Sequence, residues 1–157
     1  MDEQRMMLRH FLAALAYRTQ KALRDAPPEF AEFRVAPLVR TPHELIRHMD
    51  GVLGSARSYF TGEAYSVPYF PEFSDAVAHF HETLADLAHH LETGTELREI
   101  TLERVLQGPC CDALSHAGQF GDAEAAGGLC GAAGELYLCR RQRGEPWPGA
   151  AASGSAR

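Results

Sequence analysis

Two histidines and one aspartate form the clearest metal-binding pattern in this 157-residue chain. Asp112 and His116 are four residues apart in a segment with helical periodicity, so both side chains are expected on one helix face. His48 falls on the apolar stripe of an earlier predicted helix, one turn from Leu45 and Val52. Two imidazoles and a carboxylate can share one divalent ion and leave coordination positions open for water or substrate. The three residues are therefore the candidate metal ligands.

Both patterns also have purely structural explanations, which the residues alone leave open. A lone histidine on an apolar helix face is more often a core residue held by one hydrogen bond. An Asp–His pair at this spacing is more often an ordinary pair on a solvated helix face. We expect the remaining histidines to lie on the surface: His10, His43, His79, His81, His89 and His90.

The four cysteines show no recognised spacing of zinc ligands. They are Cys110, Cys111, Cys130 and Cys139. We expect free thiols rather than a disulfide framework, because the chain begins with the charged segment MDEQRMMLRH where a signal peptide has its apolar stretch. No catalytic residue is assigned from the sequence.

Four helices are predicted to position the candidate ligands, from apolar periodicity and helix-ending residues. The first ends before Pro27, and the second opens at Thr41 with a capping box completed by Glu44. The third ends at Gly94, and the fourth begins after Pro109. The stripes of the first three are Leu8, Leu12, Leu15, Thr19 and Leu23; Leu45, His48, Met49, Val52, Ala56 and Phe60; and Val77, Phe80, Leu84, Leu87 and Leu91.

These elements predict an all-α fold, a four-helix bundle. No stretch of the sequence has sustained strand alternation or a hairpin signal. The connections over 26–40 and 61–71 are long for a simple hairpin bundle, so at least one is expected to cross over it.

Composition excludes several classes of function. The net charge of −6 is unlike the basic footprint of a nucleic-acid-binding protein, so no nucleic-acid partner is expected. No run approaches the roughly 18 apolar residues of a membrane-spanning helix. We therefore expect a cytoplasmic protein without a membrane partner.

The chain divides into two unequal parts. Residues 1–120 carry the helical pattern and form the predicted bundle. Residues 121–157 are rich in Gly and Ala, hold 8 of the 14 glycines and end in the low-complexity run GAAASGSAR. We expect this second part to be a partly disordered tail.

Three segments of the first part resemble a known family. They are LRHFLAAL, TPHELIRHMDGVL and LQGPCCDALSHAGQF, and together they resemble the DinB/YfiT-like superfamily of small bacterial four-helix bundles, described as metalloenzymes. The family places one histidine of the second helix and a His-x-x-x-His pair of the last helix around a divalent metal. His48 and His116 match two of these positions. Asp112 stands where the pair has its earlier histidine, and Asp is also a competent ligand.

The resemblance implies a metal-dependent enzyme, either a transferase that uses a low-molecular-weight thiol or a hydrolase of a small molecule. Zinc, nickel, iron and manganese all suit two imidazoles and a carboxylate. Gln119, one turn beyond His116, is expected to orient a ligand without binding the metal itself. The family also implies a homodimer. The competing hypothesis is a metal-free, non-enzymatic bundle that acts as an interaction or stress-associated protein, with His48 simply packed in the core.

The tail also departs from the family, whose last helix continues as a Leu/Arg-rich amphipathic stretch. Codons for residues 122–127, read one nucleotide later, allow the sequence MLRRL. We therefore hypothesise that residues from about 121 onward are the product of a frameshift. Sequencing of the locus tests this hypothesis, which requires an intact downstream frame restored by one inserted or deleted base.

Overall fold

The computed structural model describes residues 2–126, and within that range every regular element is helical. The four long helices are α1 (Glu3–Leu23), α2 (Pro42–Thr61), α3 (Phe73–Thr93) and α5 (Cys111–Ala126). A 3₁₀ helix (Pro28–Glu32), the short α4 (Leu102–Val105) and a π-helix (Leu106–Cys110) complete the list. No strand occurs among residues 2–126, so the all-α prediction is confirmed.

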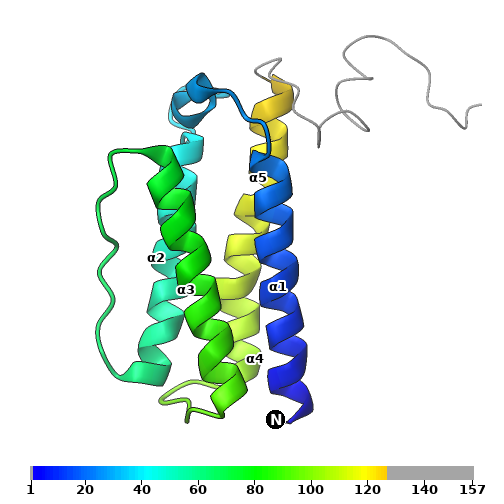
Figure 1. Cartoon of the computed structure of the whole chain (residues 1–157), viewed down its shortest axis with the longest axis vertical. Helices are drawn as coiled ribbons and strands as arrows, with labels where there is room; N and C mark the ends of the chain where they lie inside the picture. The colour runs from blue at the N-terminus through cyan, green and yellow to red at the C-terminus, as the bar shows by residue number, and fades with distance from the viewer. Residues whose placement is uncertain (1, 127–157) are drawn as a thin grey trace, which may run out of the picture.

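The long helices lie side by side with their axes nearly aligned (Figure 1). α1 packs against α3 and α5, and α2 packs against the same two helices. α1 and α5 run in one direction, whereas α2 and α3 run in the other (Figure 1). The parallel pair α2 and α3 is joined by an extended segment, residues 62–72, that returns along the length of the helices (Figure 1). At least one of the two long connections was expected to cross over the bundle, and the segment of residues 62–72 does so.

The start of α2 follows the local rules that predicted it. The Thr41 side chain accepts a hydrogen bond from the Glu44 backbone, and the Glu44 carboxylate accepts one from the Thr41 backbone. Pro42 occupies the first turn, where its missing N–H costs no hydrogen bond. The helix ends at Gly62 with a φ of 76°, a left-handed conformation that glycine adopts without steric penalty. Local chemistry therefore sets both ends of the helix that carries His48.

The core is built from the predicted stripes, with some changes. Leu8, Leu12, Leu15 and Thr19 of α1 are buried, as are Phe80, Leu84, Leu87 and Leu91 of α3. Four stripe residues expected inside are only partly buried: Leu23, His48, Val52 and Val77. Conversely, Ile46, Asp50 and Leu53 of α2 are buried, so its inward face is rotated from the prediction.

The end of α5 overlaps the predicted tail. The helix continues to Ala126, and Ala123 is only 4% exposed. The rest of the tail, residues 127–157 with Cys130 and Cys139, lies outside the described residues. Cys110 and Cys111 are free thiols, as predicted. Within residues 2–126, none of the helices has the length and apolarity needed to cross a membrane.

Candidate metal centre

His48, Asp112 and His116 come together between α2 and α5. One potential ligand atom from each lies within 4.8 Å of the other two. His48 Nε2 is 3.1 Å from Asp112 Oδ2, and His116 Nε2 is 3.7 Å from Asp112 Oδ1. The two imidazole rings meet edge to face with their centroids 4.7 Å apart. The predicted set of ligands is thus assembled from two helices.

These separations fit a shared divalent ion. Two neighbouring ligands that each bind one ion at about 2.0–2.2 Å are roughly 3–3.5 Å apart in tetrahedral or octahedral geometry. The 3.1 Å and 3.7 Å distances are close to that range, but they end on different oxygens of Asp112. Because the three ligand atoms lie within 4.8 Å of one another, a shared ion requires the side chains to draw closer together. The donors are two imidazole nitrogens and a carboxylate, which suit zinc, nickel, iron and manganese. The residues present therefore fit the group that the sequence implied.

The centre is at the rim of the molecule rather than deep in its core. The exposed fractions of the side chains are 31% for His48, 45% for Asp112 and 14% for His116. Only His116 is close to full burial. An ion at this position can therefore be reached from solvent by a second reactant.

A hydrogen bond joins the His116 ring to Gln119. The His116 Nδ1 lies 3.0 Å from the Gln119 side-chain oxygen, and the ring donates this hydrogen bond in the tautomer that has the proton on Nδ1. In that tautomer Nε2 is unprotonated, faces Asp112 and is available to a metal. Gln119 therefore contacts a candidate ligand, and its orienting role stays a prediction.

The π-helix that precedes α5 sets the position of Asp112 relative to α2. The Cys111 N–H bonds to the carbonyl of Leu106, five residues earlier, which is the widened spacing of a π turn. Pro109 lies inside this turn and has no N–H to donate, and its ring would clash with the carbonyl four residues before it in an α-helix. The wider turn accommodates the proline, and α5 begins directly afterwards.

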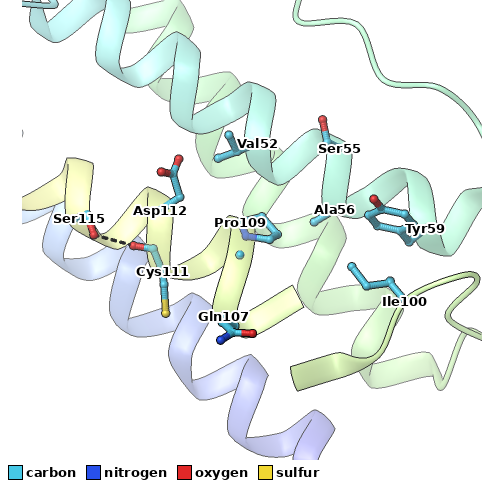
Figure 2. A pocket seen from close by; sticks show the side chains of 11 residues that line it. Val52, Ser55, Ala56, Tyr59, Ile100, Gln107, Pro109, Cys111, Asp112 and Ser115 are labelled. Atoms are coloured by element: carbon cyan, nitrogen blue, oxygen red, sulfur yellow. Dashed lines mark hydrogen bonds between the residues drawn. The ribbon is translucent and has the colours of Figure 1, made fainter. Parts of the chain in front are cut away.

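A groove of about 570 Å³ adjoins the centre on the side of the π-helix. Its wall from α2 includes Val52 and Ala56, and its opposite wall includes Pro109. Figure 2 shows the Asp112 carboxylate at one end of the groove and the Tyr59 ring at the other. The groove therefore leads directly to a candidate ligand.

A second pocket, of about 510 Å³, is lined by His48 and shares Val52 and Ser55 with the groove. Its lining includes the charged residues Glu44 and Arg47. The pKa of Glu44 is held below its ordinary value, first by the hydrogen bond from Arg34 and then by the Thr41 backbone N–H. The two pockets thus offer the centre chemically different surroundings.

The sequence prediction missed a buried carboxylate. Asp50 of α2 is 3% exposed and accepts hydrogen bonds from the Tyr65 hydroxyl at 2.7 Å and the Thr83 hydroxyl at 2.6 Å. Tyr65 also lies against Gly54, where an added Cβ would come within 2.1 Å of the ring. Burial, then the hydrogen bond to Asp50, raises the pKa of Tyr65. This cluster fixes the crossing segment on α2.

The surface assignment is wrong for four of the other histidines; three of them, His43, His79 and His90, have side chains that are 18%, 23% and 18% exposed. The first contacts the Phe70 carbonyl at 3.1 Å, and the last stacks on Phe60. His79 Nδ1 is buried 3.3 Å from Asp50 Oδ2 and makes no hydrogen bond. These rings pack because each has an aromatic or polar neighbour from another element. The fourth, His81, is partly buried beside Phe80 of its own helix, whereas His10 and His89 are exposed, as predicted.

The two described cysteines are not among the grouped ligand atoms of the candidate centre. Cys110 is buried, and this burial raises the pKa of its thiol to about 12. Cys111 is exposed, and in Figure 2 its sulfur points away from α2. Within residues 2–126, the combination of two imidazoles and one carboxylate is the metal-ligating group that the structure defines.

Comparison with known proteins finds no matching family model, no matching curated protein and no matching solved structure. The class of protein is therefore defined by the fold and the site alone. Over residues 2–126 the chain is all-helical, with a candidate centre for one divalent ion between α2 and α5.

Proposed function

We propose that this chain is a four-helix bundle of the DinB/YfiT-like type and a metal-dependent enzyme that acts on a small molecule. One observation carries the proposal. His48, Asp112 and His116 are up to 68 residues apart in the sequence, yet their ligand atoms lie within 4.8 Å of one another beside an open groove.

Each residue has a distinct role in the proposed centre. His48 and His116 bind the ion through Nε2, and Asp112 binds it through a carboxylate oxygen. Gln119 keeps the His116 ring in the orientation that presents Nε2. The bound ion supplies Lewis-acid chemistry, which activates a thiol or a water molecule for nucleophilic attack at neutral pH.

The two proposed reaction classes require different second reactants. A transferase has to accommodate a low-molecular-weight thiol together with an electrophile, whereas a hydrolase needs one organic substrate and water. The groove beside Asp112 and the adjoining pocket beside His48 offer room for two partners, and the second pocket adds the charged side chains of Glu44 and Arg47. This arrangement favours the transferase, with the hydrolase as the second candidate.

Cobalt(II) tests the proposal, because its visible absorption changes with its ligands. We expect the metal-free chain to bind Co²⁺ and, when 2-mercaptoethanol is added, to develop a near-ultraviolet charge-transfer band from sulfur to cobalt. Both signals should be lost in His48→Ala and His116→Ala. They should persist in His10→Ala, a matched change at an exposed histidine.

Each outcome separates the alternatives. Cobalt binding without the sulfur band would favour the hydrolase over the transferase. No cobalt binding by the folded parent, or binding that survives in both ligand variants, would contradict the metal-dependent proposal. The chain would then be best described as a metal-free bundle in which His48 and Asp112 serve as an ion pair between helices.

A further inference from the structure

We propose that the groove between α2 and the π-helix binds the uncharged, apolar part of a substrate whose polar end is held at the metal centre. This inference rests on the proposed function and assigns a substrate class to the same site. The substrate class is an uncharged alkyl or aryl chain that ends in a metal-binding group.

The position of the groove supports this assignment. Asp112 is both a candidate ligand and a lining residue of the groove, so a molecule that binds the ion extends directly into it. In Figure 2, Val52, Ala56 and Pro109 lie between the Asp112 carboxylate and the Tyr59 ring. A ligand anchored at the carboxylate end would thus run along apolar side chains toward an aromatic ring.

The chemistry of the walls selects an uncharged ligand. The apolar lining comes from Val52, Ala56, Ile100 and Pro109. The polar lining groups other than Asp112 are the side chains of Ser55, Tyr59, Gln107 and Ser115 and the thiol of Cys111. No lysine, arginine or histidine lines the groove, so an anionic tail would lose its hydration without gaining a partner. Asp112 is the one carboxylate there, and the proposed ion engages it.

The π-helix supplies one wall of the groove. Gln107, Gly108 and Pro109 of this turn form part of the wall, and a Cβ added at Gly108 would meet nothing within 4 Å. The volume of about 570 Å³ is within the usual range of small-molecule sites. The adjoining pocket, which shares Val52 and Ser55 with the groove, differs from it because Arg47 and Glu44 are among its lining residues. An apolar chain is therefore expected on the Asp112 side.

A series of alkyl hydroxamates tests the assignment, because a hydroxamate binds divalent ions and the chain length varies independently. The probe set runs from acetohydroxamate to octanohydroxamate, titrated into the Zn²⁺-loaded full chain by calorimetry. Affinity should rise by about fourfold for each methylene buried in the groove, until the chain reaches the far end.

Two matched variants locate the effect. Ile100→Glu places a carboxylate in the groove and should weaken octanohydroxamate binding by about tenfold or more, while acetohydroxamate binding stays nearly unchanged. Val77→Glu makes a similar change in a separate pocket of about 670 Å³ and should leave the slope with chain length intact. The increase of hydroxamate affinity with chain length in the parent protein remains a test even if a variant folds poorly.

The outcomes distinguish this inference from the proposed function, since Zn²⁺ binding is measured first without hydroxamate. Zn²⁺ binding with an affinity that rises with chain length, and loss of that rise in Ile100→Glu alone, would support both. Zn²⁺ binding with hydroxamate affinities independent of chain length would overturn the groove assignment and leave the metal centre in place. No Zn²⁺ binding would overturn both.

Discussion

His48 Nε2 lies 3.1 Å from Asp112 Oδ2, which joins α2 to α5 across 64 positions of the sequence. Both side chains are partly exposed, at 31% and 45%. An ion pair with this exposure contributes only about 0–1 kcal/mol to stability, because solvent screens it and ordering the side chains costs entropy. The small gain in stability is therefore a weak explanation for the close approach of His48 and Asp112. A metal ion bound by both side chains explains it more specifically.

Asp112→Ala separates these accounts. Without metal, the variant should lose no more than about 1 kcal/mol of unfolding free energy, measured by urea denaturation. Its affinity for Zn²⁺ should fall by about 100-fold or more, because one of three protein ligands is gone. A large loss of stability together with unchanged metal affinity would contradict the assignment of Asp112 as a ligand.

Gln119→Ala should weaken metal binding without removing a ligand. The variant frees the His116 ring to rotate and to change tautomer, so Zn²⁺ affinity should fall by about 10- to 100-fold. Gln119→Glu keeps an acceptor for the Nδ1 proton and should restore most of the affinity. Equal affinities for parent and Gln119→Ala in calorimetry would show that the hydrogen bond has no positioning role.

Thr41→Ala tests the local origin of α2. Removal of the side-chain cap should cost about 1 kcal/mol of unfolding free energy, since the Glu44 N–H loses its acceptor. Ser55→Ala, in the middle of the same helix, is the matched control and should change stability by less than about 0.5 kcal/mol. Urea denaturation of both variants gives the comparison, and equal effects would argue against the capping box.

Tyr65→Phe should alter the response of stability to alkaline pH. The pKa of Tyr65 is raised in the folded chain, so above pH 10, its ordinary pKa, the folded state retains a proton that the unfolded state loses. Stability should therefore fall as the pH rises from about 10, and this part of the fall should disappear in Tyr65→Phe. Thermal melts from pH 8 to 11 measure the slope; an unchanged slope would contradict the prediction.

The same variant should destabilise the chain at neutral pH. The lost hydroxyl leaves one oxygen of the buried Asp50 carboxylate without its donor, at a cost of about 1–3 kcal/mol. Tyr17→Phe, at a residue 59% exposed, is the matched control. A similar small effect for both variants would show that the Asp50 cluster does not secure the crossing segment.

The parts of the fold that depend on neighbouring residues were predictable. The capping box at Thr41 and the left-handed Gly94 at the end of α3 are signals contained within a few positions, and the structure has both. Asp112 and His116 were placed on one face because four residues make about one helical turn. Their meeting with His48 follows once α2 and α5 pack together.

The remaining features depend on packing between distant segments. Gly108 and Pro109 indicated a helix boundary, but only the surrounding helices decide that the chain passes through it as a π turn. Asp50 follows Ile46 by four positions and precedes Leu53 by three, a spacing that marks it as inward-facing. Its donors, Tyr65 and Thr83, come from other elements, so the sequence pattern alone could not identify them.

The most direct test of the central claim is the thermal stability of the metal-stripped chain with and without Zn²⁺, Ni²⁺, Mn²⁺ and Fe²⁺. At a concentration about 100 times the dissociation constant, an ion that binds only the folded state adds about 2.7 kcal/mol, or several degrees in Tm. We predict this shift in the parent and in His10→Ala, and its loss in His48→Ala and His116→Ala. A cooperative parent melt that none of the ions moves, or a shift that persists in both ligand variants, would contradict the metal centre.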